Sequence, residues 1–217
     1  MIEPAMKAIL IPVKRFADSK KRLAPYYSPT ARAALAEALC RDFFSVVAGV
    51  RLAQRIYVAS QEPLALEWAR ERGWHTIAET EQISESHSVD AASHLCAERG
   101  VAALLRIPID LPLATPDDID GILAAAEAGP SAVIVPSREG TGTNALLRSP
   151  PCLFPSHFGP NSFAQHLAEG ERCGANMKIL RNDHVALDID EPDDLSALAG
   201  RVRPDSAVAH WIAQYAS

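Results

Sequence analysis

Short apolar runs alternate with amphipathic stretches along most of the 217-residue chain. The runs are rich in Ile, Leu and Val and are bounded by Gly, Pro or charged residues, as is typical of buried strands. We predict strands over residues 8–13, 55–59, 74–78, 101–107, 132–135, 144–147 and 178–180. Apolar residues at helical spacing predict helices over residues 63–72, 161–168, 192–198 and 205–215, with three more that begin near residues 29, 89 and 116.

Helix-terminal residues support this assignment. Ser28-Pro29 and Thr115-Pro116 each place a capping hydroxyl before a proline, and proline suits the first helical position. Gly73 can end the helix predicted over residues 63–72. Strand and helix alternate through the first 135 residues, which favours a mostly parallel sheet covered by helices on both faces. No internal repeat or low-complexity linker divides the chain, so we expect one α/β domain over residues 1–217. We interpret residues 1–5, which precede Met6, as an N-terminal extension.

Composition narrows the functional classes. Hydrophobic residues make up 48% of the chain and charged residues 22%, as in ordinary soluble enzymes. A net charge of −6 argues against a nucleic-acid partner, and no apolar run approaches the length of a membrane span. The four cysteines form no C-x-x-C pair, so we interpret them as buried thiols in a reducing cytoplasm and expect a cytoplasmic protein.

Acidic residues follow two apolar stretches. The run from Leu104 ends in a single carboxylate, Asp110, at the point where a ligand would bind beyond the end of a parallel strand. Such an acid is either a cap or the anchor of a metal ion. A second group, Asp188 and Asp190, lies on one side of an extended segment by alternation, although Asp190 could instead cap the helix begun by Pro192. Two separate acidic sites suit Mg²⁺, which binds carboxylates together with substrate phosphates.

A basic loop follows the first predicted strand. It holds five basic residues within nine positions of an acidic protein: Lys14, Arg15, Lys20, Lys21 and Arg22. The loop is either a solvated charge run or a polyphosphate site, in which lysine and arginine neutralise phosphate charge. The chain lacks the G-x-x-x-x-G-K-[ST] and G-x-G-x-x-G motifs, so neither a P-loop nor a dinucleotide fingerprint supplies the phosphate contacts.

Two turns carry further polar groups. Residues 138–144 read R-E-G-T-G-T-N, where glycines allow backbone amides to approach an anion, although a plain hairpin turn has the same composition. Residues 158–162 read F-G-P-N-S and lead into a predicted helix, whose N-terminus is either an anion site or an ordinary capped turn.

Taken in order, these segments resemble the guanylyltransferases of deazaflavin coenzyme (coenzyme F-420) biosynthesis. The similar segments are I-P-V-K-R-F-A-D-S-K-K-R-L from Ile11, D-L-P-L-A-T-P-D-D-I from Asp110, G-T-G-T-N-A-L-L from Gly140, F-G-P-N-S-F-A-Q-H from Phe158 and L-D-I-D-E-P-D-D-L from Leu187. The resemblance implies a nucleotide-diphospho-sugar-transferase (Rossmann-like) fold. It also implies transfer of GMP from GTP to 2-phospholactate, phosphoenolpyruvate or 3-phosphoglycerate, with release of pyrophosphate.

The resemblance also implies roles for individual residues. Asp110 and Asp188 would hold Mg²⁺, with Asp190 as a further ligand. The nucleotide would be bound by Pro12, Lys14, Lys20 and Arg22. Catalysis would depend on the three cations of this group and on Asp110. The acceptor's carboxylate would be bound by Thr143, Gly159 and Ser162. We further expect a homodimer and hand-over of an unstable product to the next enzyme of the pathway.

One segment departs from the family pattern. Members commonly have a leucine–asparagine pair at the start of the helix after the third strand, where the nucleobase is bound, and here Asp90 stands in place of the asparagine. An ionised carboxylate can accept hydrogen bonds from the N1 and amino donors of guanine, so we expect Asp90 to contact the base. The alternatives are another base, another phosphorylated acceptor such as a sugar phosphate or a molybdopterin-type substrate, or a non-catalytic nucleotide-binding homologue. A glycosyltransferase is disfavoured, because Pro108 stands where a D-x-D pair needs a second acid.

Overall fold

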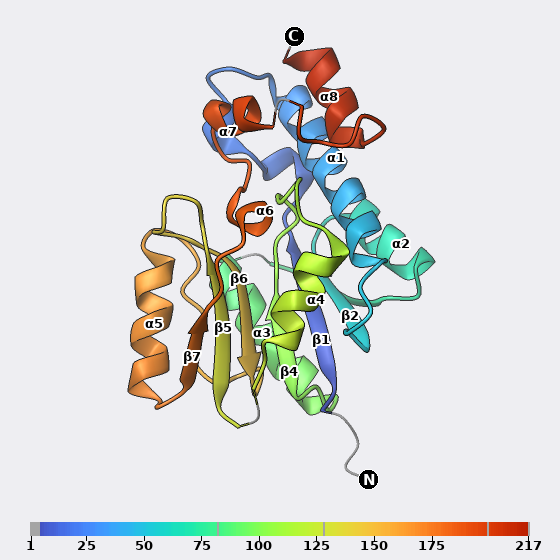
Figure 1. Ribbon diagram of the computed structural model, residues 1–217. Helices are drawn as coiled ribbons and strands as arrows, with labels where there is room; N and C mark the ends of the chain where they lie inside the picture. The colour runs from blue at the N-terminus through green and yellow to red at the C-terminus, as the bar shows by residue number, and fades with distance from the viewer. Residues whose placement is uncertain (1–4, 82, 128, 199, 217) are drawn as a thin grey trace.

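The computed structural model describes residues 5–81, 83–127, 129–198 and 200–216 (Figure 1). Within these ranges the strands form one seven-stranded sheet in the order β3-β2-β1-β4-β6-β5-β7. The strands are β1 (Lys7–Val13), β2 (Arg55–Ser60), β3 (His75–Ala78), β4 (Ala103–Arg106), β5 (Ser131–Pro136), β6 (Thr143–Ser149) and β7 (Asn176–Ile179). β6 runs antiparallel to both of its neighbours, whereas the other pairs are parallel. The predicted mostly parallel sheet is confirmed, and no predicted strand end differs by more than two residues.

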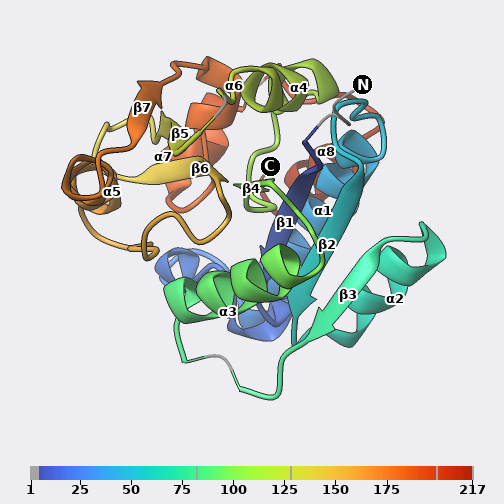
Figure 2. The same ribbon diagram turned by 90° about the horizontal axis from the view of Figure 1, so that it is seen from below.

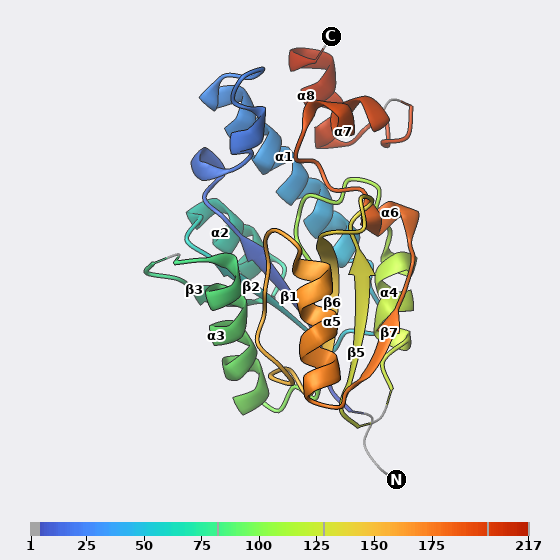
Figure 3. The ribbon, with the colours of Figure 1, turned by 90° about the vertical axis from the view of Figure 1, so that its left-hand side faces the viewer.

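Helices cover both faces of this sheet (Figures 2 and 3). The helices are α1 (Pro29–Val47), α2 (Pro63–Glu71), α3 (Glu85–Glu98), α4 (Pro116–Ala124), α5 (Ser162–Arg172), α6 (Asp183–Ala186), α7 (Pro192–Ala197) and α8 (Ala207–Tyr215). α1, α2 and α4 share one apolar cluster with the sheet, and α3 and α5 pack on the opposite face. β1 illustrates how side chains alternate between the two faces. Ile9 and Ile11 face the cluster of α1, α2 and α4, whereas Ala8 and Leu10 face α3. All four side chains are fully buried, so both faces of the strand need a covering helix.

The predicted helix caps at Ser28 and Thr115 are confirmed. The Ser28 hydroxyl accepts a hydrogen bond from the N–H of Ala31 at 3.2 Å, and Thr115 forms a reciprocal capping box with Asp118. Gly73 has a φ of 71°, a left-handed conformation that suits glycine at the end of α2.

The N-terminal half of α1 extends beyond the carboxyl edge of the sheet and is packed there by α7 and α8 (Figure 1). Trp211 of α8 is buried and donates its indole N–H to the carbonyl of Ala31 at 2.7 Å. Leu23, at the end of the basic loop, belongs to the same apolar cluster. This packing fixes the far end of the loop next to the sheet edge.

Several predicted boundaries were wrong. α3 begins at Glu85, not near residue 89, because the Ser84 hydroxyl caps the helix by accepting the N–H of His87 at 3.1 Å. α5 continues to Arg172 and so is longer than predicted. The predicted extension over residues 1–5 lies outside the described residues apart from Ala5. Among the described helices, none has the length and apolar character needed to cross a membrane.

Candidate active site

Four segments meet at one edge of the sheet. The basic loop leaves β1 there, and residue 110 follows β4. β6 starts at the same edge because it runs antiparallel to β4, which brings Thr143 and Asn144 to that edge. Segment 187–190 completes the group, since the N–H of Ile189 donates to the carbonyl of Asp110 at 3.1 Å. This is the edge at which open α/β sheets bind ligands.

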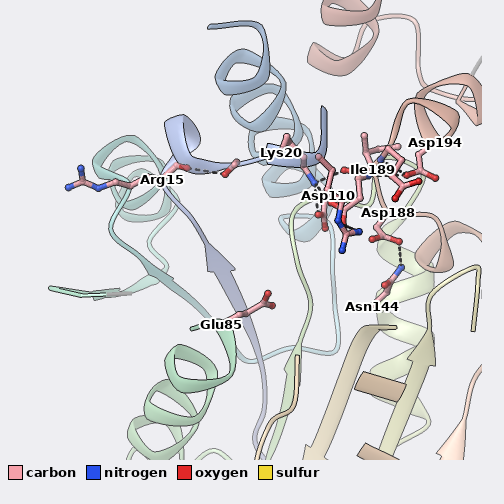
Figure 4. Close-up of polar contacts among 12 residues, drawn as sticks. Arg15, Lys20, Glu85, Asp110, Asn144, Asp188, Ile189 and Asp194 are labelled. Atoms are coloured by element: carbon pink, nitrogen blue, oxygen red, sulfur yellow. Dashed lines mark hydrogen bonds and ion pairs between the residues drawn. The ribbon is translucent and has the colours of Figure 1, made fainter. Parts of the chain in front are cut away.

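Lys20 links the basic loop to the acidic residues (Figure 4). Its ammonium donates to Asp110 Oδ2 and to the carbonyl of Ile189, both at 2.6 Å, and lies 3.3 Å from Asp190 Oδ1. Lys20 lies between two short 3₁₀ turns and has a left-handed backbone conformation, with a φ of 53°. Only 6% of its side chain is exposed. Burial lowers the pKa of Lys20, but Asp110 and Asp190 outweigh that effect and raise it above its usual value.

Asp110 is held in its charged form. Burial acts to raise its pKa, whereas the ammonium of Lys20 and then the guanidinium of Arg106 lower it, and the net pKa is below the ordinary value. At neutral pH the site therefore contains an ionised Asp110 in contact with a lysine cation.

Asp190 is not a helix cap, so that alternative was wrong. Glu191 occupies the N-cap position of α7, and Asp194 accepts the backbone N–H of Asp190 at 3.0 Å and of Glu191 at 2.8 Å. The carboxylate of Asp190 instead pairs with Lys20 and with Arg22, whose Nη1 lies 3.1 Å away. The Asp190 carboxylate is thus directed toward the basic loop and not toward the start of α7.

Asp188 is destabilised in its charged form by its surroundings. Burial, followed by the negative charge of Asp110, raises the pKa of Asp188 to about 6. Asn144 opposes this effect by donating from Nδ2 to Asp188 Oδ1 at 3.1 Å (Figure 4). Asn144 also donates to the carbonyls of Val185 and Ala186, both at 2.9 Å, which fixes the segment that presents Asp188.

These three carboxylates provide the hard oxygen donors that a divalent cation such as Mg²⁺ takes. Crowding of Asp110 and Asp188 raises the pKa of Asp188, so a cation between them would relieve their repulsion. In the described part of the chain, no group of three or more acid, histidine or cysteine side chains is arranged so that it could hold a metal ion. The Lys20 ammonium lies between Asp110 and Asp190 instead. The donor set fits a metal that also uses oxygens from a bound phosphate.

Two pockets open on the site. The first, called here the loop pocket, has a volume of about 350 Å³ and is lined by Pro12, Lys14, Lys20, Arg22, Asp110 and Asp190, among others. The second, the strand-end pocket, has a volume of about 290 Å³ and includes Thr143, Gly159, Ser162 and Asp188 in its wall. Five residues line both pockets, and these are Arg22, Glu85, Pro108, Asp110 and Asp190. The two pockets are therefore adjacent compartments of one cleft.

The hydroxyl of Thr143 has a defined orientation. His166 is fully buried, and burial, followed by the charge of Arg148, lowers the pKa of His166 to about 3, so its ring is neutral. His166 Nε2 accepts the backbone N–H of His157 at 2.9 Å, which places the ring proton on Nδ1. Nδ1 lies 3.0 Å from Thr143 Oγ1 and donates to it. The hydroxyl proton of Thr143 is thus free to donate to a ligand in the strand-end pocket.

The turn before α5 forms the opposite wall of the strand-end pocket. Gly159 has a φ of 131°, which favours glycine, and Asn161 has a φ of 57°. The N–H of Ser162 donates to the carbonyl of Gly159 at 3.2 Å, and that of Phe163 to Thr141 at 3.1 Å. These two amides of the helix N-terminus are thus already paired within the protein.

Residues 6–200 match the sequence profile of the family described as "Guanylyl transferase CofC like". A phosphoenolpyruvate guanylyltransferase from Rubrobacter xylanophilus is 36% identical over 87% of this chain and 91% of that protein. The chain belongs to the CofC-like guanylyltransferase family. It is therefore a nucleotidyltransferase, as the sequence motifs predicted.

Other relatives agree with this placement. A 2-phospho-L-lactate guanylyltransferase from Methanothermobacter thermautotrophicus is 28% identical over 87% of this chain and 82% of that protein. The crystal structure of a protein from Desulfovibrio desulfuricans G20, described as a nucleotide-diphospho-sugar transferase, has a TM-score of 0.74 at 17% identity and covers 98% of this chain and 99% of that one. The predicted fold type is confirmed.

Asp90 does not lie with the other predicted residues. Its two carboxylate oxygens each accept the backbone N–H of Ser156 at 3.1 Å, and Arg148 Nη1 lies 3.4 Å away. Asp90 is not among the residues that line either pocket of this CofC-like protein. Since α3 begins at Glu85, the start of the helix is formed by Glu85 and Ser86, and Asp90 lies more than one turn further on. In this structure Asp90 anchors the chain that leads to the strand-end pocket.

Three residues of the cleft and its support were missed from the sequence. Glu85 lies at the start of α3 and lines both pockets, Arg106 lines the strand-end pocket, and His166 orients Thr143. Arg106 could have been noticed, because it is the one charge within the apolar run before Asp110. Glu85 and His166 lack such a signal, since polar residues are ordinary near helix starts and on amphipathic helices.

Proposed function

We propose that this protein transfers GMP from GTP to the phosphate of a small phospho-carboxylic acid in coenzyme F-420 biosynthesis. Phosphoenolpyruvate is the acceptor proposed first, because the relatives with the higher identities bear that name, and 2-phospholactate and 3-phosphoglycerate follow. The observation that carries the proposal is the contact of a basic loop with an acid cluster between two adjoining pockets. One pocket would take the triphosphate and the other the acceptor.

The proposed reaction is an in-line displacement. A phosphate oxygen of the acceptor attacks the α-phosphorus of GTP, a new P–O bond forms, and the bond to the bridging α–β oxygen breaks. Pyrophosphate leaves with that electron pair. Since the acceptor phosphate is already ionised near neutral pH, no protein base is needed. The protein contributes positioning and neutralisation of charge.

The loop pocket supplies the cations for this displacement. Lys14, Lys20 and Arg22 line it and would bind the triphosphate oxygens. Lys20 would exchange carboxylate partners for phosphate ones, because its present contacts are with Asp110 and Asp190. Its side chain then stabilises the negative charge that develops on the leaving pyrophosphate.

Asp110, Asp188 and Asp190 are the proposed metal ligands. A bound Mg²⁺ would supply neutralisation of phosphate charge. Asp188, whose pKa is raised to about 6, is mostly ionised at neutral pH and is thus available as an anionic donor beside Asp110. The hydrogen bond from Asn144 keeps Asp188 directed into the cleft.

The strand-end pocket is the proposed acceptor site. Thr143, Gly159 and Ser162 line it, and Thr143 presents a hydroxyl that is oriented to donate. A carboxylate accepts such a hydrogen bond, and a charged acceptor strengthens it. The homodimer and the hand-over of product expected from the sequence remain predictions.

One incubation tests the proposal. The protein is mixed with Mg²⁺, one of the four NTPs, and one acceptor, which is phosphoenolpyruvate, 2-phospholactate, 3-phosphoglycerate or, for comparison, a sugar phosphate. GTP binding is measured by calorimetry, and the product is identified by mass. The expected result is a guanylylated acid and an equal amount of pyrophosphate. Tight GTP binding without product from any phospho-acid would favour a non-catalytic homologue, and a product only with a sugar phosphate would replace the proposed acceptor.

A further inference from the structure

Arg106 is a buried cation in the wall of the strand-end pocket. It lies on β4, four residues before Asp110, and is 6% exposed. Its Nη1 donates to the carbonyl of Asn144 at 3.0 Å and to that of Thr143 at 3.4 Å. The guanidinium carbon lies 3.9 Å from the centre of the Phe158 ring, a stacking contact. The sheet and the turn before α5 thus hold the side chain in place.

The guanidinium remains charged in this environment. Burial lowers the pKa of Arg106 to about 10, while the nearby Asp110 and Asp188 act to raise it, so it is protonated at neutral pH. Its Nε has no hydrogen-bond partner among the described residues. A buried charge requires a counter-charge, since an unpaired one is strongly unfavourable.

Glu85 supplies that counter-charge. The carboxylate pairs with Arg106 Nη2, and 26% of the Glu85 side chain is exposed, against 7% for Arg106. Figure 4 shows the Glu85 side chain extending from the start of α3 toward the part of the site that contains Asp110. The pair therefore joins a fixed cation to a carboxylate on a partly exposed side chain that can change rotamer.

The strand-end pocket lacks another buried source of positive charge among the described residues that line it. Arg22, its other cation, is 66% exposed and paired with Asp190. The first amides of α5, those of Ser162 and Phe163, are already bonded to loop carbonyls. Thr143 can donate one hydrogen bond but brings no charge. Among the described residues that line this pocket, an entering carboxylate would thus find no buried cation other than Arg106.

We propose that Arg106 is the receptor for the acceptor's carboxylate and that Glu85 occupies it in the free enzyme. The proposal rests on the proposed function and deepens it by naming a specificity-determining residue. The entering carboxylate replaces the carboxylate of Glu85, so Arg106 has one anionic partner before and after binding. The planar guanidinium can bind either carboxylate through both of its oxygens. The neighbouring Thr143 hydroxyl adds a hydrogen bond. An acceptor without a carboxylate would leave Glu85 in place and gain no such contact.

Binding measurements without turnover test this assignment. Phosphoenolpyruvate is titrated by calorimetry into protein that holds Mg²⁺ and a non-hydrolysable GTP analogue, with glycerol 3-phosphate as the ligand that lacks a carboxylate. Arg106→Met should weaken binding of phosphoenolpyruvate about tenfold to hundredfold and leave glycerol 3-phosphate and the GTP analogue unchanged. Glu85→Gln should tighten binding of phosphoenolpyruvate, because the competing carboxylate becomes neutral.

The double variant Glu85→Gln/Arg106→Met separates recognition from structure. It removes both charges, so it should fold even if Arg106→Met leaves Glu85 without a partner. If Arg106 binds the ligand, the double variant still binds phosphoenolpyruvate weakly. Recovery of wild-type binding in the double variant, or unchanged binding in Arg106→Met, would overturn the assignment. Failure of the proposed function is a different result, namely wild-type protein that yields no guanylylated acid.

Discussion

The two adjoining pockets are held together by different forces. In the loop pocket, Lys20 lies between two 3₁₀ turns and Arg22 lies on the second of them, in the loop that joins β1 to α1. The described side-chain contacts of both residues are ion pairs and one carbonyl. In the strand-end pocket, Thr143 and Arg106 belong to central strands and are fixed by buried hydrogen bonds. The loop pocket therefore depends on exchangeable charge, whereas the strand-end pocket is preorganised by the sheet.

This difference matches the two proposed tasks. A triphosphate brings several negative charges and can replace the carboxylates that now hold Lys20. A small acid must be recognised by shape and by a few directed groups, and such groups need supports that do not move.

Removal of the shared carboxylate should have the largest effect. Asp110→Asn should reduce GMP transfer at least about 1,000-fold, because the proposed metal loses a ligand and Lys20 loses its 2.6 Å partner. Pyrophosphate release measures the effect, and the melting temperature checks that the fold is kept. Asp205→Asn, at an exposed position, is the matched control. Near-wild-type transfer in Asp110→Asn would remove Asp110 from the metal role.

Removal of the loop cation should have the next largest effect. Lys20→Met should lower GMP transfer about 100-fold through loss of a charge-assisted contact to phosphate. The same change frees Asp110 and Asp190 from their internal cation. Binding of Mn²⁺ without nucleotide, measured by calorimetry, should therefore become tighter, while Lys178→Met at an exposed site on β7 leaves it unchanged. Unaltered Mn²⁺ binding in Lys20→Met would argue against a charge-held loop pocket.

A change behind the strand-end pocket should have a moderate and selective effect. His166→Leu removes the donor to Thr143 Oγ1, so the hydroxyl can turn away from the pocket. We expect the KM for the acceptor to rise about tenfold while the KM for GTP is kept. In His166→Gln an amide can still accept from His157 N–H and donate to Thr143, and the KM should recover in part. Equal effects of both variants on the two substrates would mean that His166 acts only in packing.

Apart from catalysis, the buried His166 should make stability depend on pH. The pKa of His166 is lowered to about 3 by burial first and by Arg148 second, whereas an unfolded histidine titrates near about 6.5. The folded state binds this proton less readily, so its contribution to stability is present above pH ~6.5 and is lost as the pH falls toward 3. Denaturant unfolding at several pH values should show a shallower acid-side decline in His166→Gln than in wild type. The same slope in both proteins would contradict a neutral buried His166.

Local sequence signals predicted the elements well, because each strand and most helices carry their own pattern. Ser28 and Thr115 marked helix starts through capping chemistry that acts within one turn. The start of α3 was placed too late, because the capping role of Ser84 was not recognised. Asp90 lies outside the two pockets, whereas the other predicted site residues line them, and the nucleobase contact of Asp90 stays a prediction.

The sequence by itself determined the fold class, the family and a group of residues that line the cleft at the carboxyl edge of the sheet. It could do so because strand periodicity and motif order are properties of neighbouring positions. Only the tertiary structure decided which charges pair. Glu85 and Arg106 are 21 positions apart, and Lys20 and Asp110 are 90 apart. Such pairs form only when the sheet places their strands and helices side by side, and burial then fixes their protonation states. The orientation of the Thr143 hydroxyl and the pairing of Arg106 with Glu85 are therefore properties of the folded chain.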